Sequence, residues 1–262
     1  MAQQTQVRRV AVFYTGWLRT FPTLSALARA SKADVLRRWS GLGYNSRALR
    51  LHALAKQLSE NNGGKIPRSI EELLKLPGIG KYTAHAIASF AFGAEVPVVD
   101  VNVRRIFSRV FWNIRSIHDV RPEKEIWALA ARTLPRKKAA EWNQALMDLG
   151  ALVCTARNPQ CSSCPIISMC ASAFSKAFEI KYSAKKKAEP SFKGIPRRIY
   201  RGRILKVLHE KPLTPLQLGQ RIVERFHPRD MTWIMRVLEA MEREMLIAIR
   251  GNGVGKIICI AQ

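Results

Sequence analysis

Four cysteines lie within one short stretch of this chain, at Cys154, Cys161, Cys164 and Cys170. Their spacing, Cys-x6-Cys-x2-Cys-x5-Cys, puts four thiolates on one locally wrapped loop, which is what an iron–sulfur cluster needs. A structural zinc site also takes four thiolates and is the second interpretation. A disulfide framework is disfavoured, because nothing in the sequence indicates secretion. The spacing therefore favours a cluster loop over residues 154–170 and leaves zinc open.

A second chemical signal is the glycine turn LPGIGKYT, residues 76–83. Its glycines, Gly78 and Gly80, allow a tight turn just before a helix, where backbone amides can hold a phosphate oxygen without reading bases. Taken alone, such a turn is weak evidence for DNA binding.

An acid, Asp100, follows an apolar run and precedes a basic helix in the stretch VVDVNVRR, residues 98–105. The plain interpretation of this position is a helix N-cap, which contributes about 1 kcal/mol. A catalytic carboxylate is the alternative.

The charge of the chain indicates a polyanionic partner. Its 44 Lys and Arg residues exceed its 19 Asp and Glu residues, for a net charge of +25 over 262 residues. Such an excess is typical of proteins that bind nucleic acid. No apolar stretch is long enough to span a bilayer and no signal peptide is visible, so we expect a cytoplasmic, nucleoid-associated protein of prokaryotic type without membrane contact.

Helical periodicity dominates up to about residue 180, which predicts an all-α fold there. Residues 173–196 read as a linker, because lysines mix with proline and glycine. Residues 197–262 then predict three helices, over 198–209, 215–226 and 230–245, followed by a hairpin around Gly251-Asn252-Gly253. This order predicts a small α+β, winged-helix-like domain whose third helix could read a major groove. A capping or dimerisation domain is the alternative.

Three stretches together carry a resemblance to a known family: LPGIGKYTA, VVDVNVRRIFSR, and WNQALMDLGALVC running into the cysteine loop. They resemble the helix-hairpin-helix (HhH-GPD) DNA glycosylase superfamily, which includes endonuclease III and the adenine and thymine mismatch glycosylases. The resemblance covers residues 1–172 and implies a [4Fe–4S] cluster held by the four cysteines.

Two local segments resemble the adenine glycosylase branch. The run QQTQV, from Gln3 to Val7, is similar to a helix whose glutamines enter the duplex, and GLGY, ending at Tyr44, is similar to a wedge that stacks beside the lesion. Because base flipping leaves a hole that planar side chains can fill, both are chemically sensible. An ordinary core aromatic is the plain alternative for Tyr44. The DNA-binding residues that the resemblance implies are Gln3, Gln4, Thr5, Leu42, Tyr44, Arg47, Gly78, Gly80, Lys81 and Thr83.

The resemblance also implies catalytic roles. Breaking an N-glycosidic bond builds positive charge on the sugar, and Asp100 would stabilise that charge or attack the sugar carbon. Asn102 would hold the adjoining groups. Tyr82 stands where bifunctional relatives place a lysine nucleophile, so a monofunctional glycosylase is implied, and Lys81 should point toward phosphate.

The chain departs from the family pattern in three places, one of which is His85, where many relatives have a small residue and where a buried neutral histidine is the plain interpretation. The glutamate that acts as general acid lies four residues before the Gln-Gln pair, a position outside this chain, so we expect a truncated or misassigned start. A protein that never had this acid, working through Tyr82 and Asp100 or inactive, is the other possibility. Residues 197–262 are also too short for the domain that recognises oxidised guanine.

Three functions remain open from the sequence. The leading one is removal of adenine mispaired with guanine or 8-oxoguanine, on double-stranded DNA and by a monomer. The second is excision of thymine or uracil from mismatches, using Tyr82 and Asp100. The third is a non-catalytic iron–sulfur protein that binds DNA and senses damage or regulates transcription.

Overall fold

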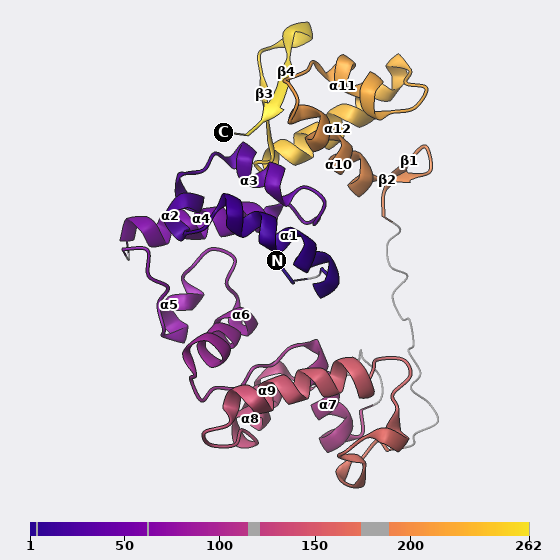
Figure 1. The fold of residues 1–262 in the computed structure, drawn as a ribbon. Helices are drawn as coiled ribbons and strands as arrows, with labels where there is room; N and C mark the ends of the chain where they lie inside the picture. The colour runs from indigo at the N-terminus through magenta and orange to yellow at the C-terminus, as the bar shows by residue number, and fades with distance from the viewer. Residues whose placement is uncertain (4, 62, 115–120, 174–188, 262) are drawn as a thin grey trace. The chain divides into compact units, whose positions relative to one another are not determined.

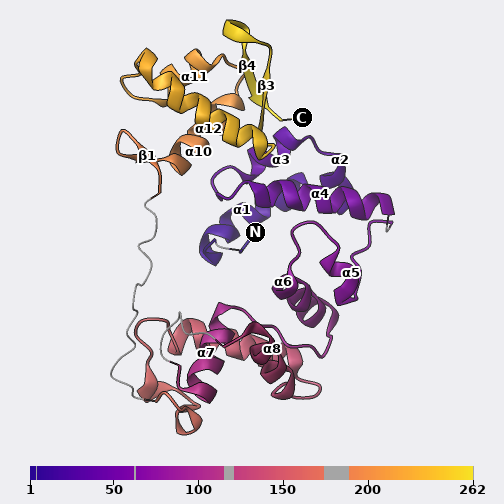
Figure 2. The same cartoon turned by 180° about the vertical axis from the view of Figure 1, so that it is seen from behind.

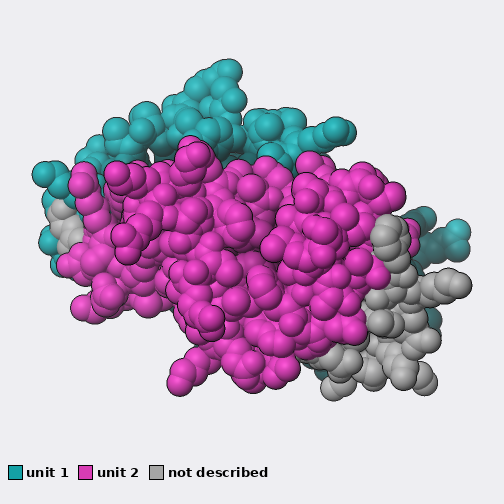
Figure 3. All heavy atoms as spheres, turned by 90° about the horizontal axis from the view of Figure 1, so that it is seen from below, with its two compact units in different colours: residues 1–66, 187–262 teal, residues 67–186 magenta. Residues whose placement is uncertain are grey.

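The computed structural model describes residues 1–3, 5–61, 63–114, 121–173 and 189–261. These residues are mostly helical, as the sequence predicts, and their strands form two short antiparallel pairs (Figure 1). They divide into two compact units, coloured separately in Figure 3. Unit 1 joins residues 1–66 to residues 187–262, and unit 2 comprises residues 67–186. Within the described ranges, no helix has both the length and the apolar character to cross a bilayer.

The first part of unit 1 is a group of helices separated by short turns. They are α1 (Val7–Thr20), α2 (Leu24–Arg29), α3 (Lys32–Trp39) and α4 (Ser46–Asn61). Hydroxyl side chains begin two of them: Thr23 Oγ1 accepts the amide of Ala26 at 3.0 Å, and Ser31 Oγ accepts the amide of Asp34 at 3.1 Å. Each bond satisfies an amide that the first helical turn would leave unpaired.

The second part of unit 1 follows the element order predicted for the C-terminal domain. Its elements are β1 (Ser191–Phe192), β2 (Ile195–Pro196), α10 (Arg197–Leu208), α11 (Pro215–Ile222), η5 (Pro228–Asp230), α12 (Met231–Arg243), β3 (Ile247–Arg250), η6 (Gly253–Gly255) and β4 (Ile257–Ile260). Strands β3 and β4 pair antiparallel, and Leu213 adds a single bridge to Ile258. Helix α11 begins at a capping box between Thr214 and Gln217.

One hydrophobic core joins the two parts of unit 1. Trp17 and Trp39 meet edge to face, with ring centroids 5.5 Å apart, and both belong to the same buried cluster as Tyr200 and Leu238. These side chains come from parts of the sequence that are far apart. Figure 2 shows from behind the helices that carry them, α1 and α3 in indigo to purple and α10 and α12 in orange to yellow. The packing of unit 1 therefore depends on both ends of the chain.

Two features of unit 1 differ from the sequence expectation. The end of the predicted linker is structured, because Phe192 of β1 stacks on Trp233 with centroids 4.2 Å apart. The helix predicted over residues 215–226 ends at Ile222, where Phe226 folds back onto it. A Cβ on Gly219 would lie 2.5 Å from the Phe226 ring, so glycine is required at that contact. The division into compact units also differs from the sequence domains 1–172 and 197–262, which stay predictions.

Unit 2 carries the glycine turn, the acid and the cysteine loop. Its elements are α5 (Ile70–Leu74), α6 (Lys81–Ala86), η1 (Ile87–Ala91), α7 (Val101–Trp112), α8 (Glu123–Arg132), α9 (Ala139–Asp148), η2 (Leu149–Val153), η3 (Cys161–Ser163) and η4 (Ile167–Met169). Its core is formed by α7, α8 and α9, through side chains such as Val103, Ile106, Ile126 and Leu146. The partly buried Cys154 and Cys170 pack against the same cluster. The core of unit 2 thus supports the cysteine loop directly.

Candidate active site

The glycine turn forms a tight hairpin between α5 and α6. Gly78 adopts φ of 78°, in the left-handed region that favours glycine, and the amide of Ile79 bonds to the carbonyl of Leu76 at 3.2 Å. Gly80 is the N-cap of α6. The ammonium group of Lys81, the first residue of α6, lies 4.2 Å from the centre of the Trp127 ring, a cation–π distance. The predicted hairpin is present, and Lys81 is held over an aromatic face of α8.

Asp100 is the N-cap of α7, as the plain interpretation of its position predicts. Its Oδ1 accepts the amides of Asn102 and Val103, both at 2.8 Å, and its Oδ2 accepts the side-chain Nδ2 of Asn102 at 2.8 Å. Three donors thus hold the carboxylate of a half-buried side chain in one orientation. The same hydrogen bonds therefore make Asp100 the helix cap and hold its negative charge in a fixed position.

Tyr82 lies close enough to Asp100 for their charges to interact. Burial raises the pKa of the Tyr82 phenol, and the negative charge of Asp100 raises it further. The phenol therefore stays protonated through neutral and mildly alkaline pH and remains a hydrogen-bond donor. The structure places Tyr82, Asp100 and Asn102 together in unit 2.

A buried amide fixes the segment that leads to Asp100. Asn143 of α9 is 1 % exposed, and its Oδ1 accepts the amide of Val98 at 3.0 Å. Its Nδ2 donates to Ser89 Oγ at 3.0 Å and to the carbonyl of Val96 at 2.9 Å. Because all these polar groups are satisfied inside the protein, the approach to Asp100 is rigidly specified.

Hydrogen bonds continue from the acid to the cysteine loop through α7. Arg105 donates to Asn102 Oδ1 at 2.9 Å, and Asn102 in turn donates to Asp100. The same guanidinium donates to the carbonyls of Gly150 at 2.6 Å and Cys154 at 2.9 Å. Gly150 permits this approach, since a Cβ there would lie 2.6 Å from the Cβ of Asn102. One arginine therefore links the carboxylate to the backbone of a cysteine.

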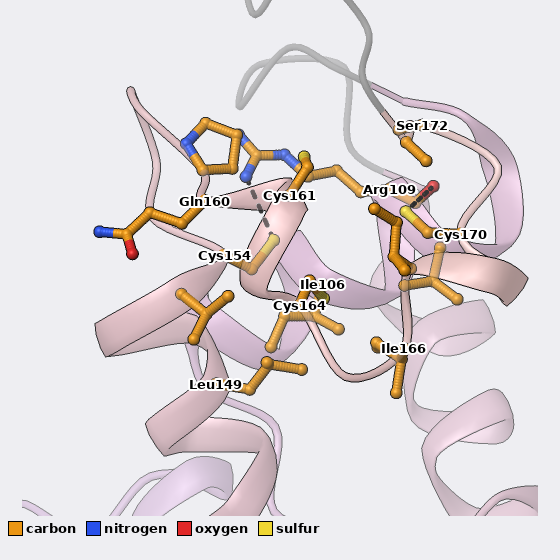
Figure 4. Close-up of a pocket in the computed structure, with 15 residues that line it drawn as sticks. Ile106, Arg109, Leu149, Cys154, Gln160, Cys161, Cys164, Ile166, Cys170 and Ser172 are labelled. Atoms are coloured by element: carbon orange, nitrogen blue, oxygen red, sulfur yellow. Dashed lines mark hydrogen bonds between the residues drawn. The ribbon is translucent and has the colours of Figure 1, made fainter.

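A second arginine of α7 lies against the cysteine loop itself. Arg109 is 2 % exposed and donates to the carbonyls of Thr155 at 2.7 Å and Ala156 at 2.8 Å. Its Nη1 also lies 3.3 Å from the Sγ of Cys154, the contact dashed in Figure 4. The guanidinium holds the start of the loop and places positive charge beside a thiol.

The four cysteines surround one cavity rather than one point. Cys154, Cys161, Cys164 and Cys170 all line it, together with apolar side chains such as Ile106 and Ile166, and all four are free thiols (Figure 4). A tetrahedral zinc site, with Zn–S bonds of about 2.3 Å, would bring its sulfurs to about 3.8 Å from one another. Among the described residues, no group of cysteine, histidine or acidic side chains is gathered tightly enough to hold a single ion. The donor set and its apolar surroundings fit a multi-iron cluster better than zinc.

In unit 1, Arg47 organises the predicted wedge. Its guanidinium donates to the carbonyl of Met1 at 2.7 Å, to Thr5 Oγ1 at 2.8 Å and to the carbonyl of Gly43 at 3.1 Å, and it also bonds to the carbonyl of Gln3. It therefore ties the N-terminal segment to the wedge segment, residues 40–46.

The predicted wedge residue Tyr44 projects from this segment. It is 63 % exposed and adopts φ of 47°, so an ordinary core aromatic is excluded as its role. The Arg47 guanidinium lies 5.4 Å from the centre of the Tyr44 ring. Leu42 is 5 % exposed and packs in the core of unit 1. Gln4 lies outside the described residues.

Comparison with known proteins gives the family. Residues 1–132 match the HhH-GPD superfamily of base excision DNA repair proteins, and residues 154–170 match the iron–sulfur binding domain of endonuclease III. The chain belongs to the HhH-GPD superfamily. This membership makes it a DNA N-glycosylase of base excision repair, and it assigns the four cysteines to a [4Fe–4S] cluster. The predicted family, fold class and cofactor are confirmed.

Similar proteins share the adenine glycosylase name. The chain is 46 % identical to the adenine DNA glycosylase of Homo sapiens over 171 residues, which are 65 % of this chain and 31 % of the human protein. It is 38 % identical to the adenine DNA glycosylase of Mycobacterium tuberculosis (strain CDC 1551 / Oshkosh) over 255 residues, 97 % of this chain and 81 % of that protein.

Among solved structures, a thermostable thymine-DNA glycosylase aligns with a TM-score of 0.61 at 28 % identity, covering 65 % of this chain and 79 % of that chain. A non-covalent endonuclease III–DNA complex aligns with a TM-score of 0.58 at 24 % identity, over 66 % of this chain, and shows a shared fold.

The predicted site residues that the structure describes are divided between the two units. Unit 2 holds Gly78, Gly80, Lys81, Tyr82, Thr83, Asp100, Asn102 and the four cysteines, and unit 1 holds Gln3, Thr5, Leu42, Tyr44 and Arg47. Sequence reasoning missed Asn143, Arg105 and Arg109. The four-residue spacing of the two arginines, which puts them on one helix face, was the available signal.

Proposed function

We propose that this chain is a monofunctional glycosylase that removes adenine mispaired with guanine or 8-oxoguanine from double-stranded DNA. The proposal is supported by the relatives named adenine DNA glycosylase, which are 46 % and 38 % identical to this chain. It is also supported by the exposed Tyr44 on its left-handed turn, a planar side chain suited to fill the gap that a flipped base leaves. We further propose that the protein acts as a monomer.

The orientation of Asp100 is the single observation that carries the mechanism. Loss of the base leaves positive charge on the deoxyribose, and a carboxylate already held by three donors needs no reorganisation to stabilise it. We infer that Asp100 faces the sugar carbon and either stabilises this charge or forms a transient bond to it. Asn102 orients the carboxylate through its side-chain amide.

The neighbouring phenol supports a hydrolytic outcome. Tyr82 stays protonated, so it can donate a hydrogen bond to the sugar or to a phosphate but cannot form a Schiff base as an amine would. Lys81 is turned to the Trp127 ring. Base release without strand cleavage is the expected reaction. The [4Fe–4S] cluster, when bound, would supply a rigid and positively flanked loop through its four cysteine ligands.

The proposal is tested by single-turnover excision from duplexes that contain A·8-oxoguanine, A·G, T·G or U·G. We expect Asp100→Asn to lower the rate of adenine excision by about 10²–10³-fold or more, because it removes the charge. Binding to the duplex should persist, since asparagine caps a helix about as well as aspartate. Asp148→Asn, at an exposed acid of the same unit, is the matched control and should excise normally.

A second candidate is excision of thymine or uracil from mismatches with guanine. It is favoured by the structural likeness to a thymine-DNA glycosylase and by a tyrosine, Tyr82, near enough to Asp100 to feel its charge. Excision confined to the T·G and U·G duplexes would establish this candidate and overturn the first. Normal rates in Asp100→Asn would remove the acid from its proposed role in either reaction.

A further inference from the structure

We propose that unit 1 contains a second DNA-binding surface, a groove between the wedge segment and α10, which holds the sugar–phosphate backbone of the duplex into which the wedge inserts. In this assignment α10, rather than α12, is the DNA-facing helix of the C-terminal domain. The inference rests on the proposed function only in that the wedge segment enters DNA.

The groove has two walls from distant parts of the sequence. One wall is the wedge segment, including Tyr44, with Arg9 of α1 behind it. The Arg9 guanidinium donates to the carbonyl of Gly41 and so fixes α1 to the wedge segment. The other wall is the first half of α10, which contributes Arg197, Arg198 and Arg201. A strand held by this groove would therefore pass directly beside Tyr44.

The charge of α10 fits a polyanion. Its sequence, RRIYRGRILKVL, contains five cations and no acid. Arg197 makes no ion pair with the acids of the described residues. Arg198 pairs with Glu189, and Arg201 pairs with Glu244 at 2.8 Å, both at positions that line the groove. The Arg198 side chain is 67 % exposed, and an ion pair at such a position is weak in water and can yield to phosphate. The Arg201 pair is bidentate and less exposed, so it holds Arg201 in place at the edge of the groove.

Helix α12 lacks these properties. Its sequence, MTWIMRVLEAMER, contains two arginines and two glutamates, so it has no excess of positive charge. One face of α12 is buried in the core of unit 1 through Ile234, Val237, Leu238 and Met241. From the sequence we expect the third helix of this domain, α12, to read the major groove. The charge distribution instead favours α10 as the helix that faces DNA.

A glycine on α10 marks where a ligand can approach the helix backbone. Gly202 lines the groove in the middle of α10, where glycine costs about 0.5–1 kcal/mol of helix stability relative to alanine. An added Cβ at Gly202 would meet no atom within 4 Å, so packing within the protein does not require glycine there. The absence of a side chain at Gly202 lets the sugar–phosphate backbone of DNA come close to α10.

The test compares matched double variants of the chain of residues 1–262 with its cluster bound. Arg197→Gln with Arg198→Gln removes two cations from the groove, and Arg236→Gln with Arg243→Gln removes two exposed cations from α12. Binding is measured on a duplex with an abasic-site analogue, between about 50 and 200 mM salt. We expect the α10 variant to bind on the order of 10-fold more weakly. We also expect the slope of log affinity against log salt to fall by about 1.8, because each phosphate contact contributes about 0.9.

A hydroxyl-radical footprint on the same duplex provides a second readout. The α10 variant should lose protection on one flank of the lesion, and the α12 variant should retain the wild-type footprint and slope. Gly202→Gln, which adds a long side chain to the groove without changing charge, should also weaken binding.

An unchanged slope and footprint in the α10 variant would overturn the proposal, and so would a loss confined to the α12 variant. An unchanged slope and footprint is also the result expected if the groove binds an acidic protein instead of DNA. These measurements do not depend on excision. A wild-type protein that excises no adenine contradicts the proposed function, whereas the binding slope alone decides the groove.

Discussion

Helices α7 and α10 are both twelve residues long and both rich in arginine, yet their arginines lie in different surroundings. In unit 2, Arg105 and Arg109 of α7 turn inward, to backbone carbonyls and to the Sγ of Cys154. In unit 1, Arg197, Arg198 and Arg201 of α10 line an open groove, and only Arg203 turns to a backbone carbonyl, that of Ile222. Arginines therefore mainly brace the fold in α7 and mainly form a candidate DNA surface in α10.

The difference arises from what lies opposite each helix. The first residues of the cysteine loop present the carbonyl oxygens of Cys154, Thr155 and Ala156 to α7, and buried acceptors need donors. Across its groove, α10 faces the wedge segment, Arg9 and two exposed glutamates, while its other face packs in the core of unit 1. The net charge of a chain therefore indicates its partner only when the arginines that bond to the protein's own carbonyls are not counted.

The largest expected effect is on the inward arginines. Arg109→Leu leaves the carbonyls of Thr155 and Ala156 without donors, so we expect the free energy of unfolding to fall by about 2–4 kcal/mol. The visible absorption of the cluster should also weaken. Denaturant unfolding and the absorption spectrum measure these effects. Arg104→Leu, at the half-exposed neighbour on the same helix, is the control, and equal losses in both variants would contradict the internal-brace role.

The link between acid and cluster loop should appear in the rate of excision. Arg105→Gln removes the connection from Asn102 to the Cys154 carbonyl, and we expect excision to slow by about 10–100-fold with little change in DNA binding. Arg105→Lys should rescue only part of this loss, because one ammonium cannot reach three separated acceptors. A full rescue by lysine would show that charge alone, and not position, is required.

A smaller effect is expected from His209, at the C-terminal end of α10. Burial lowers the pKa of its imidazole, and the positive charge of Arg37 lowers it further. Neither ring nitrogen has a hydrogen-bond partner among the described residues. The folded state therefore holds this histidine neutral, whereas the unfolded chain takes up a proton near pH 6.5.

Stability should accordingly fall as the pH drops below about 6.5, because the unfolded state then binds more protons. His209→Leu should lose less of its thermal stability between pH 7.5 and pH 5 than the wild type loses. An equal loss in the two proteins would exclude His209 as a source of acid sensitivity.

The smallest effect on stability is expected for the arginines of α10 that line the groove. Arg197→Gln with Arg198→Gln should change the free energy of unfolding by no more than about 0.5 kcal/mol, because the two positions open the first turn of α10 and neither side chain is buried. Thermal unfolding of the α10 double variant and of Arg109→Leu under the same conditions measures the difference in stability. A strongly destabilised α10 variant would mean that its arginines also brace the fold.

The sequence predicted what depends on nearby residues. The cysteine spacing identified the cluster loop, the two glycines identified the hairpin, and the position of Asp100 identified a helix cap, since each depends on a few adjacent residues. The direction of Arg105 and Arg109 could not be predicted, because it depends on carbonyls more than forty residues away. The contact between Trp17 and the cluster that contains Tyr200 is similarly remote.

The discontinuity of unit 1 has a consequence for how the protein is made. During synthesis the helices of residues 1–66 emerge before unit 2, but the side chains of residues 187–262 that complete their core are made only after unit 2. Unit 2 is continuous and can fold, and receive its iron, while the nascent chain is still growing. The early helices must meanwhile expose apolar surface such as Trp17 and Trp39, so synthesis of this protein should depend on chaperones more than the size of either unit suggests.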